Sequence, residues 1–318
     1  MNFPDSILQS VAFIFADNST TLVPVGTGFF VTISEYFRGI QLGTLYFVTA
    51  RHVIENCAAY YSNRDVNLRL NLKSGGTENI SVPISAFKQS HIDSSADITA
   101  WQVSVDVSRY ALAALGPQFM APRDFLSGRK IYKNGIGTDA IIVGLYHRMY
   151  GADRNIPIVK RASISAVPEE LIRTKLGHAK LYILETFSFG GLSGSPVFSV
   201  SRGYENATAS TTANSSRRND HGLAFQTIIK LEENYSLLGV VHGHWETEEE
   251  NFGTAQSHKS IGGSKTLNEG MMLVTPIELF EEIVKEDHFC AGRDISNRQQ
   301  IERIKISHPE LIEKFLTD

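Results

Sequence analysis

The sequence predicts an all-β protein, a barrel or a sandwich, because hydrophobic residues mostly recur at every second position within short segments. The clearest case is residues 65–84, where apolar and polar residues alternate on both sides of Ser74-Gly75-Gly76, as in a β-hairpin with one buried face. Turn residues separate the other segments. Strands are expected at 26–33, 44–50, 98–103, 139–146, 158–167, 180–187, 195–200 and 236–244.

The pattern changes at the C-terminal end, where helices are expected. Pro276 opens a helical pattern over 276–289, with Ile277, Phe280 and Ile283 on one face. A second helix is expected over roughly 298–316, interrupted by Pro309. Residues 104–130 have no strong pattern and are expected to cross between two halves of the chain. The polar segments 201–222 and 246–269 are expected to be loops.

Composition excludes some function classes. The chain has 318 residues, of which 42% are hydrophobic, which allows two domains or one double-lobed domain. The formal net charge is −4, with lysine and arginine scattered, so neither nucleic acid nor a membrane surface is an expected partner. The N-terminus has no basic region before its short apolar run, and two isolated cysteines fit a reducing compartment. We expect a cytoplasmic protein.

One turn stands out in the second half of the chain. Residues 187–198 read FSFGGLSGSPVF, so Ser193 lies between Gly190-Gly191 and Gly194, with a strand on either side. Such a turn is either ordinary or holds a nucleophile against backbone N–H groups.

A serine nucleophile needs a base, and the base needs an orienting acceptor. His52 directly follows the strand expected at 44–50, and Asp97 begins the strand expected at 98–103. Taken alone, each is more often a structural residue. The order His52, Asp97, Ser193 makes the three together a candidate set.

These residues lie in motifs that resemble those of the chymotrypsin-like (trypsin-like) serine proteases. The resemblance spans roughly residues 10–286, and its motifs are GTGFFV (26–31), TARHV (49–53), ADITAW (96–101), GLSGSP (191–196), LLGVVHGH (237–244) and GMMLVTP (270–276). It implies two antiparallel six-stranded β-barrels with C-terminal helices, and an active site in the cleft between the barrels. We expect an N-terminal barrel over 1–110, a linker and C-terminal barrel over 111–286, and a helical tail over 287–318. The C-terminal amphipathic helices are expected to pack on the second barrel.

The same resemblance implies the roles of the site residues. Ser193 is the expected nucleophile, His52 the general base and acid, and Asp97 the residue that orients the imidazole. The N–H groups of Gly191 and Ser193 are the expected oxyanion hole. The expected reaction is hydrolysis of a polypeptide substrate, with no cofactor and no metal.

Residue 192 departs from the digestive members of the family, which carry aspartate there to pair with a newly cut N-terminus. Leu192 cannot form this pair, so we expect no activation of that kind. The chain is more similar to the bacterial or intracellular HtrA-like branch, without a PDZ domain, and to glutamyl endopeptidases. The substrate pocket is expected at Phe187, His242, Gly243 and His244, and the non-acidic Phe187 disfavours substrates with arginine or lysine.

Two other functions are open. An α/β-hydrolase esterase needs G-x-S-x-G, but position 195 is serine, and the order of the three residues is the reverse. A catalytically silent binding or regulatory module with the protease fold is the stronger alternative. In either case a regulatory protein could bind the C-terminal helices or the polar loops.

Overall fold

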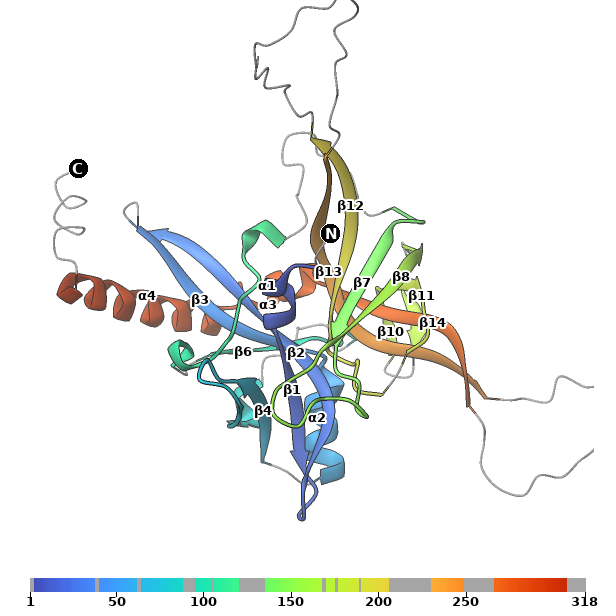
Figure 1. The fold of residues 1–318 in the computed structure, drawn as a ribbon, viewed down its shortest axis with the longest axis horizontal. Helices are drawn as coiled ribbons and strands as arrows, with labels where there is room; N and C mark the ends of the chain where they lie inside the picture. The colour runs from blue at the N-terminus through green and yellow to red at the C-terminus, as the bar shows by residue number, and fades with distance from the viewer. Residues whose placement is uncertain are drawn as a thin grey trace, which may run out of the picture.

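The computed structural model describes most of the chain. The described residues are 3–37, 40–61, 64–87, 95–103, 106–119, 135–167, 170–174, 177–188, 190–205, 230–248 and 266–307. They form two β-lobes and two C-terminal helices (Figure 1). No helix among them is long and apolar enough to cross a membrane.

The first lobe is an antiparallel sheet of six strands in the order β5-β4-β1-β2-β3-β6. The short helix α1 (Asp5–Gln9) precedes the sheet, and helix α2 (Arg51–Tyr61) follows β3. The strands are β1 (Val11–Asp17), β2 (Leu22–Phe37), β3 (Ile40–Thr49), β4 (Asp65–Asn71), β5 (Thr77–Pro83) and β6 (Thr99–Gln102).

The second lobe is a closed antiparallel barrel in the order β11-β14-β13-β12-β7-β8. Its strands are β7 (Asp139–Gly144), β8 (Ile158–Ala166), β11 (Tyr182–Glu185), β12 (Pro196–Glu205), β13 (Lys230–Glu248) and β14 (Thr266–Pro276). A separate small hairpin, β9 (Ile172–Thr174) with β10 (Gly177–Ala179), was not expected from the sequence.

The two lobes repeat one topology. In each, the first three strands are neighbours in sequence order, and the sixth, fifth and fourth strands follow them around the sheet. The predicted chymotrypsin-like double barrel is thereby confirmed as the fold class. The first lobe is a half-barrel rather than a closed one, since β5 and β6 do not pair within the described residues. The division into segments 1–110, 111–286 and 287–318 stays a prediction.

The hydrophobic core continues from one lobe to the other. Phe13, Phe29 and Phe30 of the first sheet belong to the same buried cluster as Phe198 and Val240 of the second barrel. The interior of the second barrel forms a cluster of its own, which includes Ile142, Leu184, Leu192, Val197 and Met272. The continuous cluster fixes one lobe against the other, which a site between the lobes requires.

The predicted hairpin at 65–84 is confirmed as β4 and β5, whereas the strand β1 was missed. Residues 11–16 of β1 are all buried, so the sequence shows a continuous apolar run and no alternation. Two expected loops are also shorter than predicted. Strand β12 extends to Glu205, and β13 and β14 include residues 246–248 and 266–269. The remaining residues, 206–229 and 249–265, lie outside the described part of the chain.

Only part of the predicted crossing segment 104–130 is described. Residues 106–119 contain two 3₁₀ turns, Val107–Arg109 and Pro117–Phe119, and run along the first sheet. Leu115 N–H donates to Phe30 O at 2.8 Å, and Thr32 N–H donates to Leu115 O at 3.0 Å. The segment is therefore tied to β2 before it leaves the first lobe.

The C-terminal helices differ from the prediction in their bounds and in their position. Helix α3 spans Glu278–Ile283 and α4 spans Asp287–Ser307, so the chain turns at 284–286, where one continuous helix was expected. The expectation that this region packs on the second barrel was wrong for α4, which lies along β3 of the first lobe (Figure 1). The second predicted helix, at 298–316, is only the C-terminal part of α4, and residues 308–318 lie outside the description.

Polar pairs explain why α4 packs on the first lobe. Arg293 Nε donates to Glu35 Oε1 at 2.7 Å, and Asn297 Nδ2 donates to Glu35 Oε2 at 2.7 Å. Beside them, the Phe289 and Tyr46 rings meet edge to face at 5.5 Å. Burial lowers the pKa of Arg293, but its bonds to Tyr46 and Glu35 outweigh burial and raise the pKa above the ordinary value. The guanidinium therefore stays charged.

Replacing Phe289 with alanine is expected to lower the free energy of unfolding by about 3 kcal/mol, because Phe289 is 2% exposed and its loss leaves a cavity against Tyr46. Ile295 on the same helix is 58% exposed, so Ile295→Ala is the matched control, expected to change stability by no more than about 0.5 kcal/mol. Urea unfolding measures both. Equal effects would show that α4 does not cover Tyr46.

Neither cysteine forms a disulfide. Cys57 lies buried on α2 and Cys290 is partly buried on α4. Burial raises the pKa of the Cys57 thiol to about 11, so this group is a neutral core side chain rather than a nucleophile at neutral pH.

Candidate active site

His52 and Asp97 form the centre of the site. His52 is the second residue of α2, which begins directly after β3, and Asp97 lies two residues before β6. His52 Nδ1 lies 2.7 Å from Asp97 Oδ2, and His52 N–H donates to Asp97 Oδ1 at 2.9 Å. A carboxylate can only accept, so Nδ1 carries the ring hydrogen and Nε2 is left as the acceptor. The bond from Nδ1 to the carboxylate fixes the tautomer, and together with the bond from the backbone N–H it fixes the orientation of the ring.

A second imidazole contacts the same carboxylate. His242 Nδ1 lies 3.0 Å from Asp97 Oδ2, without the alignment of a regular hydrogen bond. Asp97 is 1% exposed, and burial alone would raise its pKa. The contacts with His242 and His52 outweigh burial and lower the pKa of Asp97 below its ordinary value. The site thus holds a buried carboxylate in its charged form.

The position of His242 follows from a bulge in β13. The pairing of β13 with β14 shifts between Val241 and Gly243, which leaves His242 as the unpaired residue of the ladder. Bulges of this kind redirect a side chain. From the sequence, His242 was expected in the wall of the substrate pocket. The structure places it against Asp97, and its part in the pocket stays a prediction.

The Ser193 turn is held between the two lobes. Thr27 N–H, from β2, donates to Ser193 O at 2.9 Å, and Gly194 N–H donates to Val241 O of β13 at 2.9 Å. A Cβ atom placed on Gly26 would lie 2.7 Å from Val53 Cγ1 and 3.2 Å from Ser193 O. The turn therefore packs beside the helix that carries His52.

Gly194 has no room for a side chain. Its φ is +83°, and a Cβ atom there would lie 2.0 Å from Thr27 O and 2.2 Å from Thr49 Oγ1. Gly194→Ala is expected to displace the turn. A positive φ alone costs alanine about 1–2 kcal/mol, and the steric clash adds to this loss of stability. Gly243→Ala, where a Cβ atom meets nothing within 4 Å, is the stability control. Equal urea midpoints for the two variants would contradict the packing described for Gly194.

The backbone of the turn leaves two donors free. Gly194 N–H and Ser195 N–H both donate to carbonyl oxygens, whereas Gly191 N–H and Ser193 N–H have no acceptor within the described part of the chain. Gly191 adopts a φ of +99°, and its carbonyl accepts from Thr27 Oγ1 at 2.8 Å. That hydroxyl in turn accepts from Leu145 N–H at 2.9 Å. Two unpaired N–H groups next to a serine hydroxyl can bind an oxyanion.

Two neighbours of Ser193 are buried in the second barrel. Leu192 is fully buried in the barrel's own cluster, and Ser195 is fully buried with its Oγ atom unpartnered in the described structure. Ser193 itself is partly exposed, so of Ser193 and Ser195 it is the one that a substrate could reach.

The other expected pocket residues lie along one side of the second barrel. Phe187 is 64% exposed, and its carbonyl accepts a hydrogen bond from Lys160 Nζ. Gly243 and His244 pair with Leu273 and Met272 of β14. Phe189, within the same turn region, lies outside the described residues. The assignment of a substrate pocket to Phe187, Gly243 and His244 stays a prediction.

The described residues contain no group of three or more histidine, cysteine, aspartate or glutamate side chains placed to hold a metal ion.

Comparisons with known proteins give likeness of fold only. No family model matches the chain, and no curated protein matches it. Among solved structures, the chain is similar to the MamO protease domain from Magnetospirillum magneticum, with 8% identity and a TM-score of 0.48, covering 88% of this chain and 98% of that one.

Two further structures are similar over comparable lengths. An inactive Ser343Ala form of Rv3671c from M. tuberculosis shares 12% identity at a TM-score of 0.39, covering 88% of this chain and 87% of that one. Human heparin binding protein shares 10% identity at a TM-score of 0.45, covering 89% and 93%.

Proposed function

We propose that this protein is a serine endopeptidase that hydrolyses peptide bonds through an acyl-enzyme. The observation that carries the proposal is the pairing of His52 with the buried, charged Asp97 beside the Ser193 turn. A buried carboxylate that accepts the Nδ1 hydrogen orients the imidazole and stabilises the imidazolium, and a general base uses both effects. The two free N–H groups of the turn, at Gly191 and Ser193, add support.

The reaction proceeds in two halves. Ser193 Oγ attacks the peptide carbonyl carbon while His52 Nε2 takes the hydroxyl proton, and the carbonyl oxygen becomes an oxyanion facing Gly191 and Ser193 N–H. The C–N bond then breaks as His52 returns the proton to the leaving amine. In the second half, water attacks the acyl carbon, His52 takes a proton from it, and the serine leaves with that proton, which releases a carboxylic acid. Asp97 stabilises the imidazolium in both halves.

No activating N-terminal ion pair is part of the proposal. Leu192 occupies the position where such a pair would need an acid, and it is fully buried among apolar residues. A charge could be placed there only at the expense of the barrel core.

A catalytically silent module with the same fold is the second candidate, and one observation favours it. No hydrogen bond joins Ser193 Oγ to His52 in the described part of the chain. Catalytic hydrogen bonds are often long in the absence of substrate and tighten only on binding, so this observation does not outweigh the pairing at Asp97.

The proposal is tested by incubating the purified full-length protein with a peptide library and identifying new termini by mass spectrometry. Cleavage by the wild type and none by Ser193→Ala supports the proposal. Cleavage that persists in Ser193→Ala would assign the activity to a contaminant, and no cleavage by the wild type would favour the silent module. The residues before the cut bonds would also show which substrate side chains the pocket accepts.

A further inference from the structure

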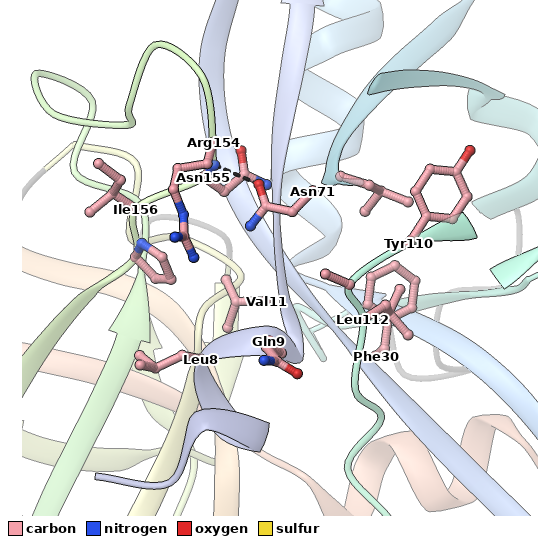
Figure 2. A pocket seen from close by; sticks show the side chains of 13 residues that line it. Leu8, Gln9, Val11, Phe30, Asn71, Tyr110, Leu112, Arg154, Asn155 and Ile156 are labelled. Atoms are coloured by element: carbon pink, nitrogen blue, oxygen red, sulfur yellow. Dashed lines mark hydrogen bonds between the residues drawn. The ribbon is translucent and has the colours of Figure 1, made fainter. Parts of the chain in front are cut away.

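A cavity lies away from the candidate active site, where the two lobes meet. Its volume is about 360 Å³, within the range of small-ligand sites. The first lobe contributes Leu8, Val11 and Leu70, and the crossing segment contributes Leu112. Arg154 and Asn155 come from the second lobe's segment 145–157, which we name the 145–157 loop (Figure 2).

The walls of the cavity are mostly apolar, and the one charge on them is positive. Of the thirteen residues that line it, Arg154 is the only charged one. Arg154 is exposed and has no ion-pair partner among the described residues. In Figure 2 the Arg154 side chain lies on the same side of the cavity as Ile156 and Val11. An apolar cavity with one unpaired guanidinium selects an anion that also carries an apolar group. A carboxylate is the expected anion, because it pairs with a guanidinium through two parallel hydrogen bonds.

The residue next to Arg154 is anchored in the wall of the cavity. Asn155 is 4% exposed, and it is held in place by two bonds: its N–H donates to Asn71 Oδ1 at 2.7 Å, and its Nδ2 donates to Arg69 O at 2.6 Å. Its Oδ1 has no hydrogen-bond partner within the described structure and is buried in the wall, so a ligand meets the apolar side chains and Arg154 rather than this amide.

We propose that this cavity binds a carboxylate that has one bulky apolar group. The apolar group lies against Leu8, Leu70 and Leu112, and the carboxylate pairs with Arg154. Two sources share this chemistry: the C-terminal residue of a peptide and a small N-acylated amino acid.

The 145–157 loop connects the cavity to the serine turn. At one end of the loop, Leu145 N–H donates to Thr27 Oγ1, which donates to Gly191 O, and His147 N–H donates to Gly190 O at 3.4 Å. Near the other end, Arg69 Nη1 donates to Gly151 O at 2.8 Å. A ligand bound at Arg154 therefore contacts the same segment that positions Gly190 and Gly191. The cavity is an effector site, a role that rests on the proposed peptidase function.

Calorimetry tests the binding independently of catalysis. The protein is full-length Ser193→Ala, and the probes are N-acetyl-L-phenylalanine, its amide, and an acetylated hexapeptide of five alanines and a C-terminal phenylalanine. The acid is expected to bind with a Kd of about 1 mM or below, and the amide about tenfold more weakly. If the hexapeptide binds at least as tightly as the acid, the source is a peptide C-terminus. If the hexapeptide binds more weakly than the acid, the source is the small N-acylated amino acid.

Matched variants locate the binding. Arg154→Gln is expected to weaken the acid about tenfold without affecting the amide, whereas Arg148→Gln, an exposed arginine of the same loop, is expected to change neither. Leu112→Trp, which fills the cavity, is expected to abolish both. Equal binding of acid and amide, no binding of any probe, or an unchanged Kd in Arg154→Gln would each overturn the proposed site.

The effector role has its own readout. In the wild type, a saturating concentration of N-acetyl-L-phenylalanine is expected to change the rate at which a fluorophosphonate labels Ser193, and Arg154→Gln is expected to remove the effect. Binding without any change in rate would overturn the effector role alone. A complete absence of labelling would contradict the proposed function and leave the calorimetric result intact as a test of the site.

Discussion

Replacing Ser193 with alanine is expected to lower kcat by about 10⁶-fold, the size of effect found when a triad nucleophile is removed. The physical reason is that the acyl-enzyme cannot form without Oγ, while the His52–Asp97 pair and the free N–H groups of the turn remain. The KM for a cleaved peptide is expected to change little, because Ser193→Ala adds no bulk to the site. Steady-state kinetics on a peptide identified from the library measures both constants.

Ser195→Ala is the matched control for this experiment. Ser195 lies two residues away in the same turn, but its hydroxyl is fully buried and unpartnered in the described structure. Its removal is expected to leave kcat within a few-fold of the wild type. A loss in Ser195→Ala comparable to that in Ser193→Ala would mean that the turn, rather than the Ser193 hydroxyl, carries the activity.

Asp97→Asn is expected to lower kcat by about 10⁴-fold while leaving the fold intact. An amide at this position can offer its N–H₂ group to His52 Nδ1, which stabilises the tautomer with the hydrogen on Nε2. The imidazole would then have no lone pair facing Ser193, and no carboxylate would stabilise the imidazolium. Kinetics together with an unchanged far-UV circular dichroism spectrum separates this effect from unfolding. A kcat within tenfold of the wild type would contradict the assignment of Asp97.

The same variant tests the charge of Asp97 through its pH dependence. Because the pKa of Asp97 is lower in the folded protein than in the unfolded chain, the carboxylate contributes stability fully above its ordinary pKa of about 3.9. That contribution is lost as the pH falls below this value toward the lower pKa of the folded state. Urea unfolding should therefore find Asp97→Asn less stable than the wild type at pH 7, with a smaller difference near pH 3. A difference that stays constant or grows on acidification would contradict the lowered pKa.

Much of the fold could be read from local patterns. The alternation in 65–84 predicted β4 and β5, because one face of that hairpin is buried and the other is not. The strand β1 could not be found in this way, since its residues 11–16 are buried on both faces and lose the period of two. The position of α4 was also not predictable from periodicity, because Arg293 and Asn297 anchor it through Glu35, 258 and 262 positions earlier in the chain.

Part of the candidate site could likewise be predicted from the sequence, and part could not. His52, Asp97 and the Ser193 turn stand at strand ends that the sequence marks, and the structure pairs the first two directly. The contact of His242 with Asp97 depends on a one-residue bulge in β13, which no local pattern in LLGVVHGH signals. The free N–H groups at Gly191 and Ser193 depend on hydrogen bonds from Thr27, which is more than 160 residues away in the chain.

Covalent labelling tests whether Ser193 is an activated nucleophile. The full-length protein would be treated with a fluorophosphonate and digested, and the modified residue identified by mass spectrometry, with His52→Ala treated in parallel. We predict stoichiometric modification at Ser193 in the wild type and at least about 10³-fold slower modification in His52→Ala. Absence of labelling at Ser193, or labelling that His52→Ala leaves unchanged, would contradict the activation of Ser193 by His52.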